Sequence, residues 1–586
     1  MKIIFTKPVF VIGLLLVLAT TIHAQTTSLN GEWKALIDPG GTGDWRQVWL
    51  EDKPQHKTDF FEYSFTGAPV LKVPGDFNSQ RCELTYFEGT VWYNKQFNYS
   101  LQPGRRLFLH FGAVNYIAEV YLNGRKLGSH EGGFTPFQFE ITGQVKAGAN
   151  ALVVKVNNQR HADGLPGNGY DWLNYGGITR EVELKETPGT YIEDYSLQLK
   201  KGSVHTAAGW VQLNGTQSAQ NITIKIPELN LVYNTRTDDK GMAAIEFSAA
   251  FTLWSPALPK LYKIVIASET DTVGDRVGFR SIEVQGNKIL LNNKPVFLKA
   301  VNIHEENPYK GARAWSKQDA VVLLKAAKEL GCNLVRLAHY PHSENMVKEA
   351  EKMGLMVWSE LPIYQHIEFA DSAVRAKMQT MLQEMVHRDK NRCAVVIWSL
   401  SNETYPATPN RTEALVALTQ QCRALDSTRL ITHVSNSQGY QNNTFNVWDP
   451  LYNVCDLVSL NEYIGWYIPW QGKPADTKWN LVCPGKPVFI SEFGGEALYG
   501  SHYGSTDEAA YFTEAYQANI YTAQLQLFNT VPNLCGVCPW LLFDYRSPGR
   551  MHPVYQKGYN RKGLLSNKGE KKKAWYVMYG YYRQKI

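Results

Sequence analysis

Eight short apolar segments alternate with helix-like stretches between residues 284 and 586, and this alternation restricts the possible folds more than any other feature. Each segment has the length of a buried strand, whereas residues 317–330, 343–353 and 373–388 are predicted to be helices. Eight strands that alternate with helices over roughly 300 residues favour a (β/α)₈ TIM barrel. A doubly wound open sheet is the alternative, but no glycine-rich nucleotide loop supports it. The strands are predicted at residues 297–302, 334–338, 356–359, 395–400, 430–434, 457–460, 488–490 and 536–542.

Residues 27 to about 283 have a different pattern, in which short β-branched runs are separated by Gly and Pro. Asn123-Gly124 lies between two such runs and predicts the type I′ turn of a β-hairpin. Many short strands with frequent turns indicate all-β sandwiches, and a break near residues 187–189 divides the region into two. We therefore expect one β-sandwich over 25–187, a second over 188–283, and the barrel over 284–586.

The first 24 residues have the pattern of a cleavable signal peptide. Lys2 and Lys7 precede an apolar run over residues 9–19, and Ala24 is a small residue before the expected mature start at Gln25. The run is too short for a membrane helix, although an uncleaved N-terminal anchor is the alternative. No later stretch has the ~18 consecutive apolar residues that a membrane span needs. We expect an exported protein, periplasmic or secreted, without a membrane span.

Composition excludes some classes of function. The chain has 60 Lys and Arg against 54 Asp and Glu, so a net charge of +6 over 586 residues gives no case for nucleic-acid binding. The eight cysteines are sparse, which does not indicate a disulfide scaffold. Cys535 and Cys538 have the spacing of a redox motif, but they lie in an apolar run and are predicted to be buried strand residues. No Cys and His cluster completes a metal site, and we expect neither a metal nor an organic cofactor.

Two carboxylates follow predicted barrel strands, where barrel enzymes place their chemistry. Glu403 comes just after the fourth strand and Glu492 just after the seventh, so the barrel would bring them together on one rim. Two carboxylates across a cleft are what hydrolysis of a glycosidic bond requires, since one protonates the leaving oxygen and the other attacks or activates water. Each glutamate alone is also compatible with a helix cap or a surface position, but the pair at two strand ends predicts a glycosidase.

These residues lie in segments that resemble glycoside hydrolase family 2. Residues 388–403 are similar to its acid/base signature, and Ser491-Glu492 with the following Phe-Gly is similar to its nucleophile segment. The β-rich half also resembles this family, which implies an N-terminal sugar-binding jelly roll and an immunoglobulin-like β-sandwich before the barrel. The jelly-roll segments are residues 29–33, 73–75 and 132–136, and the immunoglobulin-like segments are residues 253–256 and 261–262.

The resemblance implies a role for each matched residue. Glu403 is the expected general acid/base and Glu492 the expected nucleophile of a retaining double displacement. Asn402 matches a residue that holds the sugar 2-hydroxyl, and Tyr463 one that hydrogen-bonds the nucleophile. His304 and His339 match sugar-binding positions, although each is also compatible with a structural histidine. Trp540, at the end of the eighth strand, is expected either as the floor under the sugar ring or as core packing.

Three segments resemble the β-glucuronidase branch. They are residues 460–467, which end at Tyr467, residues 171–180, whose Asp171 is expected to reach the substrate, and residues 560–563. In the third, Asn560 and Lys562 match an Asn-x-Lys motif that holds the uronate carboxylate, and an ammonium and an amide can bind a carboxylate through charge-assisted hydrogen bonds. The basic composition of residues 557–573 offers an ordinary surface interpretation of the same motif, and Arg546 and Arg550 depart from the branch near the expected rim.

We therefore expect an exported retaining exo-β-glycosidase that removes terminal β-D-glucuronic acid from a glucuronide or an acidic oligosaccharide. A β-galactosidase of the same family and a β-galacturonidase are the alternatives. A catalytically inactive carbohydrate-binding protein is the alternative from a different class of function. The family resemblance also makes a homo-oligomer possible.

Overall fold

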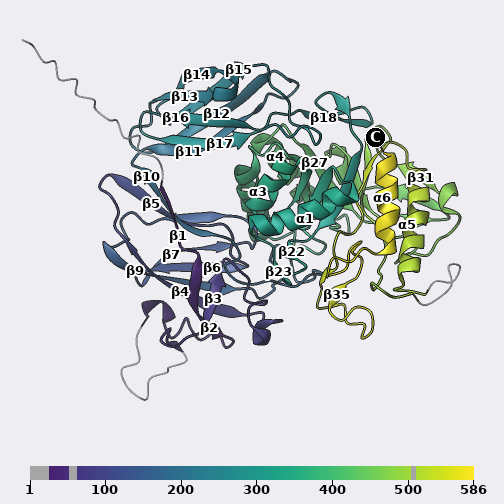
Figure 1. Cartoon of the computed structure of the whole chain (residues 1–586), viewed down its shortest axis with the longest axis horizontal. Helices are drawn as coiled ribbons and strands as arrows, with labels where there is room; N and C mark the ends of the chain where they lie inside the picture. The colour runs from purple at the N-terminus through teal and green to yellow at the C-terminus, as the bar shows by residue number, and fades with distance from the viewer. Residues whose placement is uncertain (1–24, 52–62, 438, 503–509, 586) are drawn as a thin grey trace, which may run out of the picture.

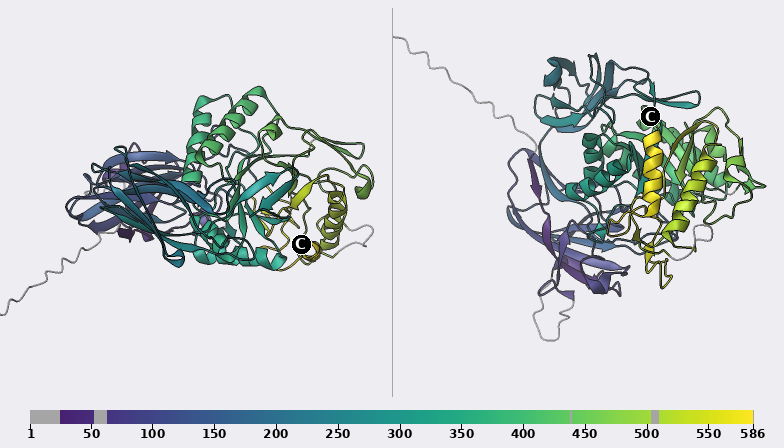
Figure 2. Two further views of the ribbon diagram at one scale, coloured as in Figure 1. Left: turned by 90° about the horizontal axis from the view of Figure 1, so that it is seen from above. Right: turned by 45° about the vertical axis from the view of Figure 1, so that its right-hand side comes forward.

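Three domains follow one another along the chain in the computed structural model, which describes residues 25–51, 63–437, 439–502 and 510–585 (Figure 1). The predicted signal peptide lies outside the described residues. Figure 2 shows that the two β-rich domains lie on the same side of the barrel. Among the described helices, none is long and apolar enough to cross a membrane.

The first domain is a β-sandwich of a four-stranded and a six-stranded sheet, with strand orders β1-β10-β5-β8 and β3-β2-β4-β9-β6-β7. Apolar side chains alternate along the strands and fill the space between the sheets, as Val91, Tyr93, Val154 and Val156 do. Asn123 and Gly124 both have positive φ, 52° and 80°, and join β6 to β7, so the predicted hairpin is confirmed. The strands are β1 Gln25–Ser28, β2 Gly31–Asp38, β3 Val70–Val73, β4 Thr90–Tyr99, β5 Arg105–Phe111, β6 Ile117–Leu122, β7 Arg125–Glu131, β8 Phe137–Glu140, β9 Gly148–Asn157 and β10 Val182–Pro188.

The second domain is a smaller sandwich of two antiparallel sheets with strand orders β11-β12-β15 and β14-β13-β16-β17. Isoleucine side chains from both sheets, such as Ile222, Ile224, Ile245 and Ile264, form its core. The strands are β11 Tyr191–Leu199, β12 Thr206–Asn214, β13 Asn221–Ile226, β14 Leu231–Arg236, β15 Met242–Ser248, β16 Tyr262–Ala267 and β17 Thr272–Val277. A small sheet connects this domain to the barrel along the chain. Its strands are β18 Ile282–Gln285, β19 Lys288–Leu291 and β20 Lys294–Pro295.

The third domain is a closed barrel of eight parallel strands, so the predicted fold class is confirmed. Its strands are continuous apolar runs, because helices cover their outer face and the packed side chains of the barrel interior cover their inner face. The eighth strand is shorter than predicted and ends at Val537, although the next residue, Cys538, still donates its backbone N–H to the carbonyl of Ile490 in β32 at 2.8 Å. The strands are β21 Leu298–Ile303, β24 Leu334–Leu337, β25 Met356–Glu360, β26 Val395–Asn402, β27 Leu430–Ser435, β30 Val458–Asn461, β32 Val488–Glu492 and β33 Leu534–Val537. Cys535 and Cys538 are buried free thiols, as predicted.

Six α-helices lie outside the barrel within the described residues, and the fifth and sixth strands are not followed by one. In their place, β28 Tyr440–Gln441, β29 Thr444–Val447 and β31 Lys478–Leu481 form a small sheet. The helices are α1 Lys317–Leu330, α2 Glu344–Met353, α3 Ser372–Asp389, α4 Pro409–Leu425, α5 Glu514–Phe528 and α6 Lys573–Gln584. Short strand pairs, β22 Glu306–Asn307 with β23 Ala312–Arg313 and β34 Tyr545–Arg546 with β35 Tyr559–Asn560, lie in loops at the carboxyl end of the barrel.

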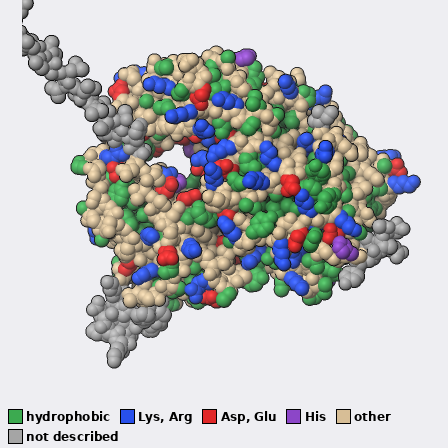
Figure 3. All heavy atoms as spheres, viewed as in Figure 1, with side chains coloured by type: hydrophobic (Ala, Val, Ile, Leu, Met, Phe, Trp, Pro, Cys, Tyr) green, Lys and Arg blue, Asp and Glu red, His purple; other side chains and the backbone are tan. Residues whose placement is uncertain are grey.

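Two buried arginines fasten the β-domains to the barrel. Arg180 of the first sandwich donates to both carboxylate oxygens of Glu305 at 3.2 Å and to the carbonyl of Pro341 at 2.7 Å. Arg280, at the end of the second sandwich, donates to the carbonyls of Cys393, Val395 and Thr428. Between these attachments the three domains surround an open hollow, visible in Figure 3, with charged side chains of both signs on its walls.

We predict that Arg280→Ala destabilises the attachment of the second sandwich. The substitution removes three hydrogen bonds from a guanidinium to buried carbonyls, so the free energy of unfolding should fall by about 3 kcal/mol or more. Chemical denaturation followed by tryptophan fluorescence measures this change. The exposed Arg236→Ala on β14 is the matched control, and equal stability of the two variants would contradict the prediction.

Candidate active site

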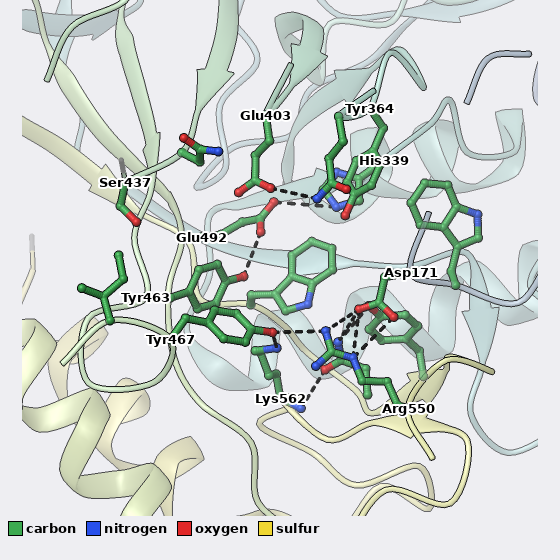
Figure 4. Close-up of a pocket in the computed structure, with 17 residues that line it drawn as sticks. Asp171, His339, Tyr364, Glu403, Ser437, Tyr463, Tyr467, Glu492, Arg550 and Lys562 are labelled. Carbon is green, nitrogen blue, oxygen red and sulfur yellow. Dashed lines mark hydrogen bonds and ion pairs between the residues drawn. The ribbon is translucent and has the colours of Figure 1, made fainter. Parts of the chain in front are cut away.

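A cavity of about 440 Å³ opens at the carboxyl ends of the barrel strands. Most of its wall comes from residues that follow barrel strands, as expected for this fold. The first sandwich also contributes, because the segment between β9 and β10 reaches over the barrel and places Asp171 and Trp172 in the wall. Figure 4 shows the carboxylates of Glu403 and Glu492 close together on one side, with Lys562 and Arg550 across the cavity.

Glu492 is the last residue of β32 and is held by three side chains. Arg336 Nη1 donates to Glu492 Oε1 at 2.7 Å, and Tyr463 Oη donates to Glu492 Oε2 at 2.8 Å. His339 Nε2 lies 3.7 Å from Oε1. Both carboxylate oxygens are therefore fixed in direction, and the guanidinium balances the negative charge.

Arg336 is itself a fully buried charge inside the barrel, and it is paired on every side. It donates to both oxygens of Glu360, at 3.0 and 2.9 Å, and to the side-chain oxygens of Asn302 and Asn402. Burial alone would raise the pKa of Glu360, but Arg336 and a hydrogen bond from His339 lower it to about 2. The ion pair thus stays charged at neutral pH, and its arginine holds Glu492 in place through the hydrogen bond to Oε1.

Glu403 stands just past β26 in the left-handed backbone region, with φ of 52°. Residues other than glycine and asparagine seldom adopt this backbone conformation, and such backbone strain is concentrated at functional sites. Asn461 donates to Glu403 Oε1 at 2.9 Å and Gln365 to Oε2 at 3.2 Å. Burial, followed by the negative charge of Glu492, raises the pKa of Glu403 above its ordinary value. The environment therefore favours a protonated Glu403 beside its charged neighbour.

Lys562 lies at the other end of the cavity from this pair. Its ammonium makes one hydrogen bond within the described residues, to Tyr467 Oη at 2.6 Å, and the nearest carboxylate oxygen there, Glu496 Oε1, is 3.6 Å away. Burial alone would raise the pKa of Tyr467, but the charges of Lys562 and Arg550 lower it below its ordinary value. This end of the cavity is therefore positive where a ligand would meet it.

Arg550 fills the space between Lys562 and the first sandwich. Its guanidinium pairs with Asp171 at 2.5 Å and with the buried Glu496 at 2.8 Å. Asn560 donates to Asp171 Oδ2 at 3.2 Å and to Tyr545 Oη at 3.1 Å. Both arginine and asparagine are thus occupied by neighbours, which leaves Lys562 as the less compensated cation.

Aromatic rings form the remaining wall. Trp540 is stacked on the imidazole of His339 with ring centroids 4.7 Å apart, and both line the cavity. His304 does not line it, because its ring is packed behind Trp540 and against Tyr545. Asn402 is likewise buried just outside the wall. Its oxygen accepts from Arg336 and Asn461, and its amide nitrogen has no partner within the described residues.

Several site residues were not singled out from the sequence. Arg336 is a lone charge in an apolar strand, and Glu360 ends the third strand as Glu492 ends the seventh. Applying the strand-end rule to every strand would have found Glu360. Gln365 and Tyr545 lie in loops, where no spacing signal identifies them.

Comparisons with known proteins agree with this architecture. The model of the glycosyl hydrolases family 2 sugar-binding domain matches residues 27–188, and that of the family 2 TIM barrel domain matches residues 282–532. A β-glucuronidase of Rattus norvegicus is 27% identical over 565 residues, which are 87% of this chain and 84% of the relative. One of Streptococcus agalactiae is 27% identical over 582 residues, or 88% and 93% of the two chains. The structure of an uncultured Clostridium sp. β-glucuronidase has a TM-score of 0.82 and 26% identity, covering 96% of this chain and 98% of that one.

The coupling between the two carboxylates can be measured directly. We predict that Glu492→Gln lowers the pKa of Glu403, because it removes the negative charge that disfavours ionisation of Glu403. The pKa is read from carboxyl NMR of protein labelled with ¹³C-glutamate, using the resonance that Glu403→Gln abolishes. Glu413→Gln, at an exposed position on α4, should leave the titration unchanged. A Glu403 pKa that does not fall in Glu492→Gln would refute the coupling.

Proposed function

The chain belongs to glycoside hydrolase family 2, and on that basis we propose that it is a retaining exo-β-glycosidase that hydrolyses terminal β-D-glucuronides. The observation that carries the specificity is Lys562, a buried ammonium that hydrogen-bonds no carboxylate in the described part of the chain and lies across the cavity from Glu403 and Glu492 (Figure 4). The β-glucuronidases among the similar proteins support the same substrate class.

In the first step, Glu492 attacks the anomeric carbon while Glu403 gives its proton to the glycosidic oxygen. The bond from the anomeric carbon to that oxygen breaks, and a glycosyl ester forms on Glu492. The geometry suits this division of roles, because Arg336 and Tyr463 hold Glu492 in position and the raised pKa of Glu403 keeps a proton available.

In the second step, Glu403 removes a proton from water, and the resulting oxygen attacks the anomeric carbon. The ester to Glu492 breaks, so the two inversions give net retention. As pH rises through the pKa of Glu403, the proton needed in the first step is lost and the rate falls. The proposed donor to the sugar 2-hydroxyl is the amide nitrogen of Asn402, which lies just outside the cavity wall and has no partner among the described residues, and the Trp540 ring offers a face for the sugar.

In this proposal, the carboxylate of the uronic acid binds at the positive end of the cavity, beside Lys562. Lys562 has two further N–H donors for it, and its present partner Tyr467 is half exposed to solvent. Asn560 would have to exchange Asp171 or Tyr545 for the ligand, so Lys562 is the main contact. A neutral galactoside would leave the ammonium with Glu496, 3.6 Å away, as its nearest counterion among the described residues, whereas a β-D-galacturonide presents the same carboxylate and is the second candidate.

Export remains a proposal from the sequence, based on the signal-peptide pattern of residues 1–24. A homo-oligomer likewise remains a prediction, and light scattering with size-exclusion chromatography measures it.

The proposed function is tested by hydrolysis of four aryl glycosides. We expect a clear preference for β-D-glucuronide over β-D-galacturonide, β-D-galactoside and β-D-mannoside, with the β-anomer released first as seen by NMR. Glu492→Gln is the blank and should reduce the rate by roughly 10³-fold or more. Preference for the galactoside, or initial release of the α-anomer, would contradict the proposal. No hydrolysis of any substrate would favour the binding-protein alternative.

Lys562→Ala tests the carboxylate contact. A charge-assisted hydrogen bond is worth about 1.5–3 kcal/mol, so kcat/KM for the glucuronide should fall by about 10- to 100-fold. Activity on neutral aryl glycosides should change little, because they have no carboxylate to hold. Lys557→Ala, in the same basic stretch but outside the cavity wall, is the matched control. Equal losses on charged and neutral substrates would exclude this role.

A further inference from the structure

A second groove begins at Glu403 and continues the surface of the catalytic cavity. The two share Glu403, Asn436 and Ser437 in their walls. In Figure 4, Ser437 lies on the other side of Glu403 from Asp171 and Arg550, so the groove leads away from the positive end. The small sheet that replaces the fifth and sixth barrel helices forms its outer part, through β29.

Two exposed aromatic rings stand in the wall of this groove. Tyr405 follows Glu403 by two residues and is 54% exposed, and Trp448 follows β29 and is 65% exposed. Single exposed rings occur elsewhere on the described surface, but two of them beside one groove, next to a candidate proton donor, point to a ligand.

A buried ion pair in the wall of the groove joins the chain segments that carry the two rings. Arg411 of α4 pairs with Asp449 through two hydrogen bonds, at 3.0 and 2.7 Å, and also donates to the hydroxyl of Thr404 at 3.0 Å. Thr404 immediately precedes Tyr405, and Asp449 immediately follows Trp448. The clamp therefore joins the backbone segments that carry the two rings, and a bidentate pair of this kind is rigid.

The charge of the groove suits a neutral ligand. Glu403 belongs to the shared wall, and the Arg411–Asp449 pair is internally balanced. The other polar side chains in the described wall are amides and hydroxyls, such as Asn446 and Ser437. Each of these groups can both donate a hydrogen bond to a sugar hydroxyl and accept one from it. A second uronate would find no cation here comparable with Lys562.

We propose that this groove binds a neutral sugar ring, the first unit of the leaving group, with Trp448 and Tyr405 packed against its C–H faces. This inference rests on the proposed function, in which Glu403 protonates the leaving oxygen, since the leaving group must then lie beside Glu403. The substrate class that follows is an oligosaccharide chain ending in a uronic acid linked to a neutral sugar.

The test compares substrates that share a glucuronosyl group and differ in the leaving group. They are methyl β-D-glucuronide, whose leaving group does not reach the rings, 4-nitrophenyl β-D-glucuronide, and a disaccharide with the glucuronosyl group on a neutral hexose. In Trp448→Ala, the disaccharide-to-methyl ratio of kcat/KM should fall about tenfold, the size of a lost aromatic contact. Trp448→Phe should retain most of the ratio, and Tyr576→Ala, an exposed ring on α6, should retain all of it.

An unchanged disaccharide-to-methyl ratio in both Trp448→Ala and Tyr405→Ala would overturn the inference. A loss confined to the aryl glucuronide would overturn it too, because the groove would then take a flat aromatic group. Thermal melting identifies a variant that fails to fold, in which case Trp448→Phe and Trp448→Leu carry the comparison. If the wild type hydrolyses none of the three glucuronides, the proposed function fails, and the same ratio is measured with the glycosides it does hydrolyse.

Discussion

The buried guanidinium of Arg336 is the constraint on which the site depends. A charge without water inside a barrel is tolerated only when it is fully paired, and removing one partner would leave the others uncompensated. Here its partners come from four other strands, through Asn302, Glu360, Asn402 and Glu492. The same hydrogen bonds that make the charge acceptable therefore align five strands and fix Glu492. Stability of the barrel interior and position of the carboxylate cannot be separated.

The site is completed by a domain that has no part in the barrel. The segment between β9 and β10 brings Asp171 to the cavity, and Arg180 fastens the end of that segment to Glu305. Tyr175 in the same segment donates to Glu306 at 2.8 Å. These buried contacts join the first sandwich directly to the rim of the barrel. From the sandwich side, Asp171 pairs with Arg550 of the barrel domain at 2.5 Å.

The sequence was sufficient to predict those parts of the structure that follow a simple hydrophobic period. Apolar runs of strand length located the eight barrel strands, and the strand-end rule selected Glu403 and Glu492 before any geometry was known. It was insufficient to predict those parts whose structure is determined by tertiary contacts. Among the described residues no helix follows the fifth or the sixth strand, and residues 440–441, 444–447 and 478–481 instead pair as a small sheet. The pairing between β29 and β31 across 30 residues leaves no local signal. His304 ends a strand as His339 does, yet only packing determines that Tyr545 and Trp540 cover it. Arg336 lay within a predicted strand, but its role depends on partners far apart in the chain.

The distribution of charge in the cavity explains why one cation stays incompletely paired. Glu496 is buried close to both Arg550 and Lys562, but its hydrogen bonds go to Arg550, Gln556 and the backbone of Arg561. Asp171 is likewise committed to Arg550, Asn560 and Ser547. The two carboxylates are thus engaged elsewhere, and the ammonium of Lys562 has only a phenol hydroxyl within hydrogen-bond distance among the described residues. Burying a cation costs stability, and the Tyr467 hydroxyl and the Glu496 carboxylate, 3.6 Å away, offset that cost among the described residues. A ligand carboxylate would add a directly hydrogen-bonded partner to this cation, and this is the basis of the uronate specificity proposed above.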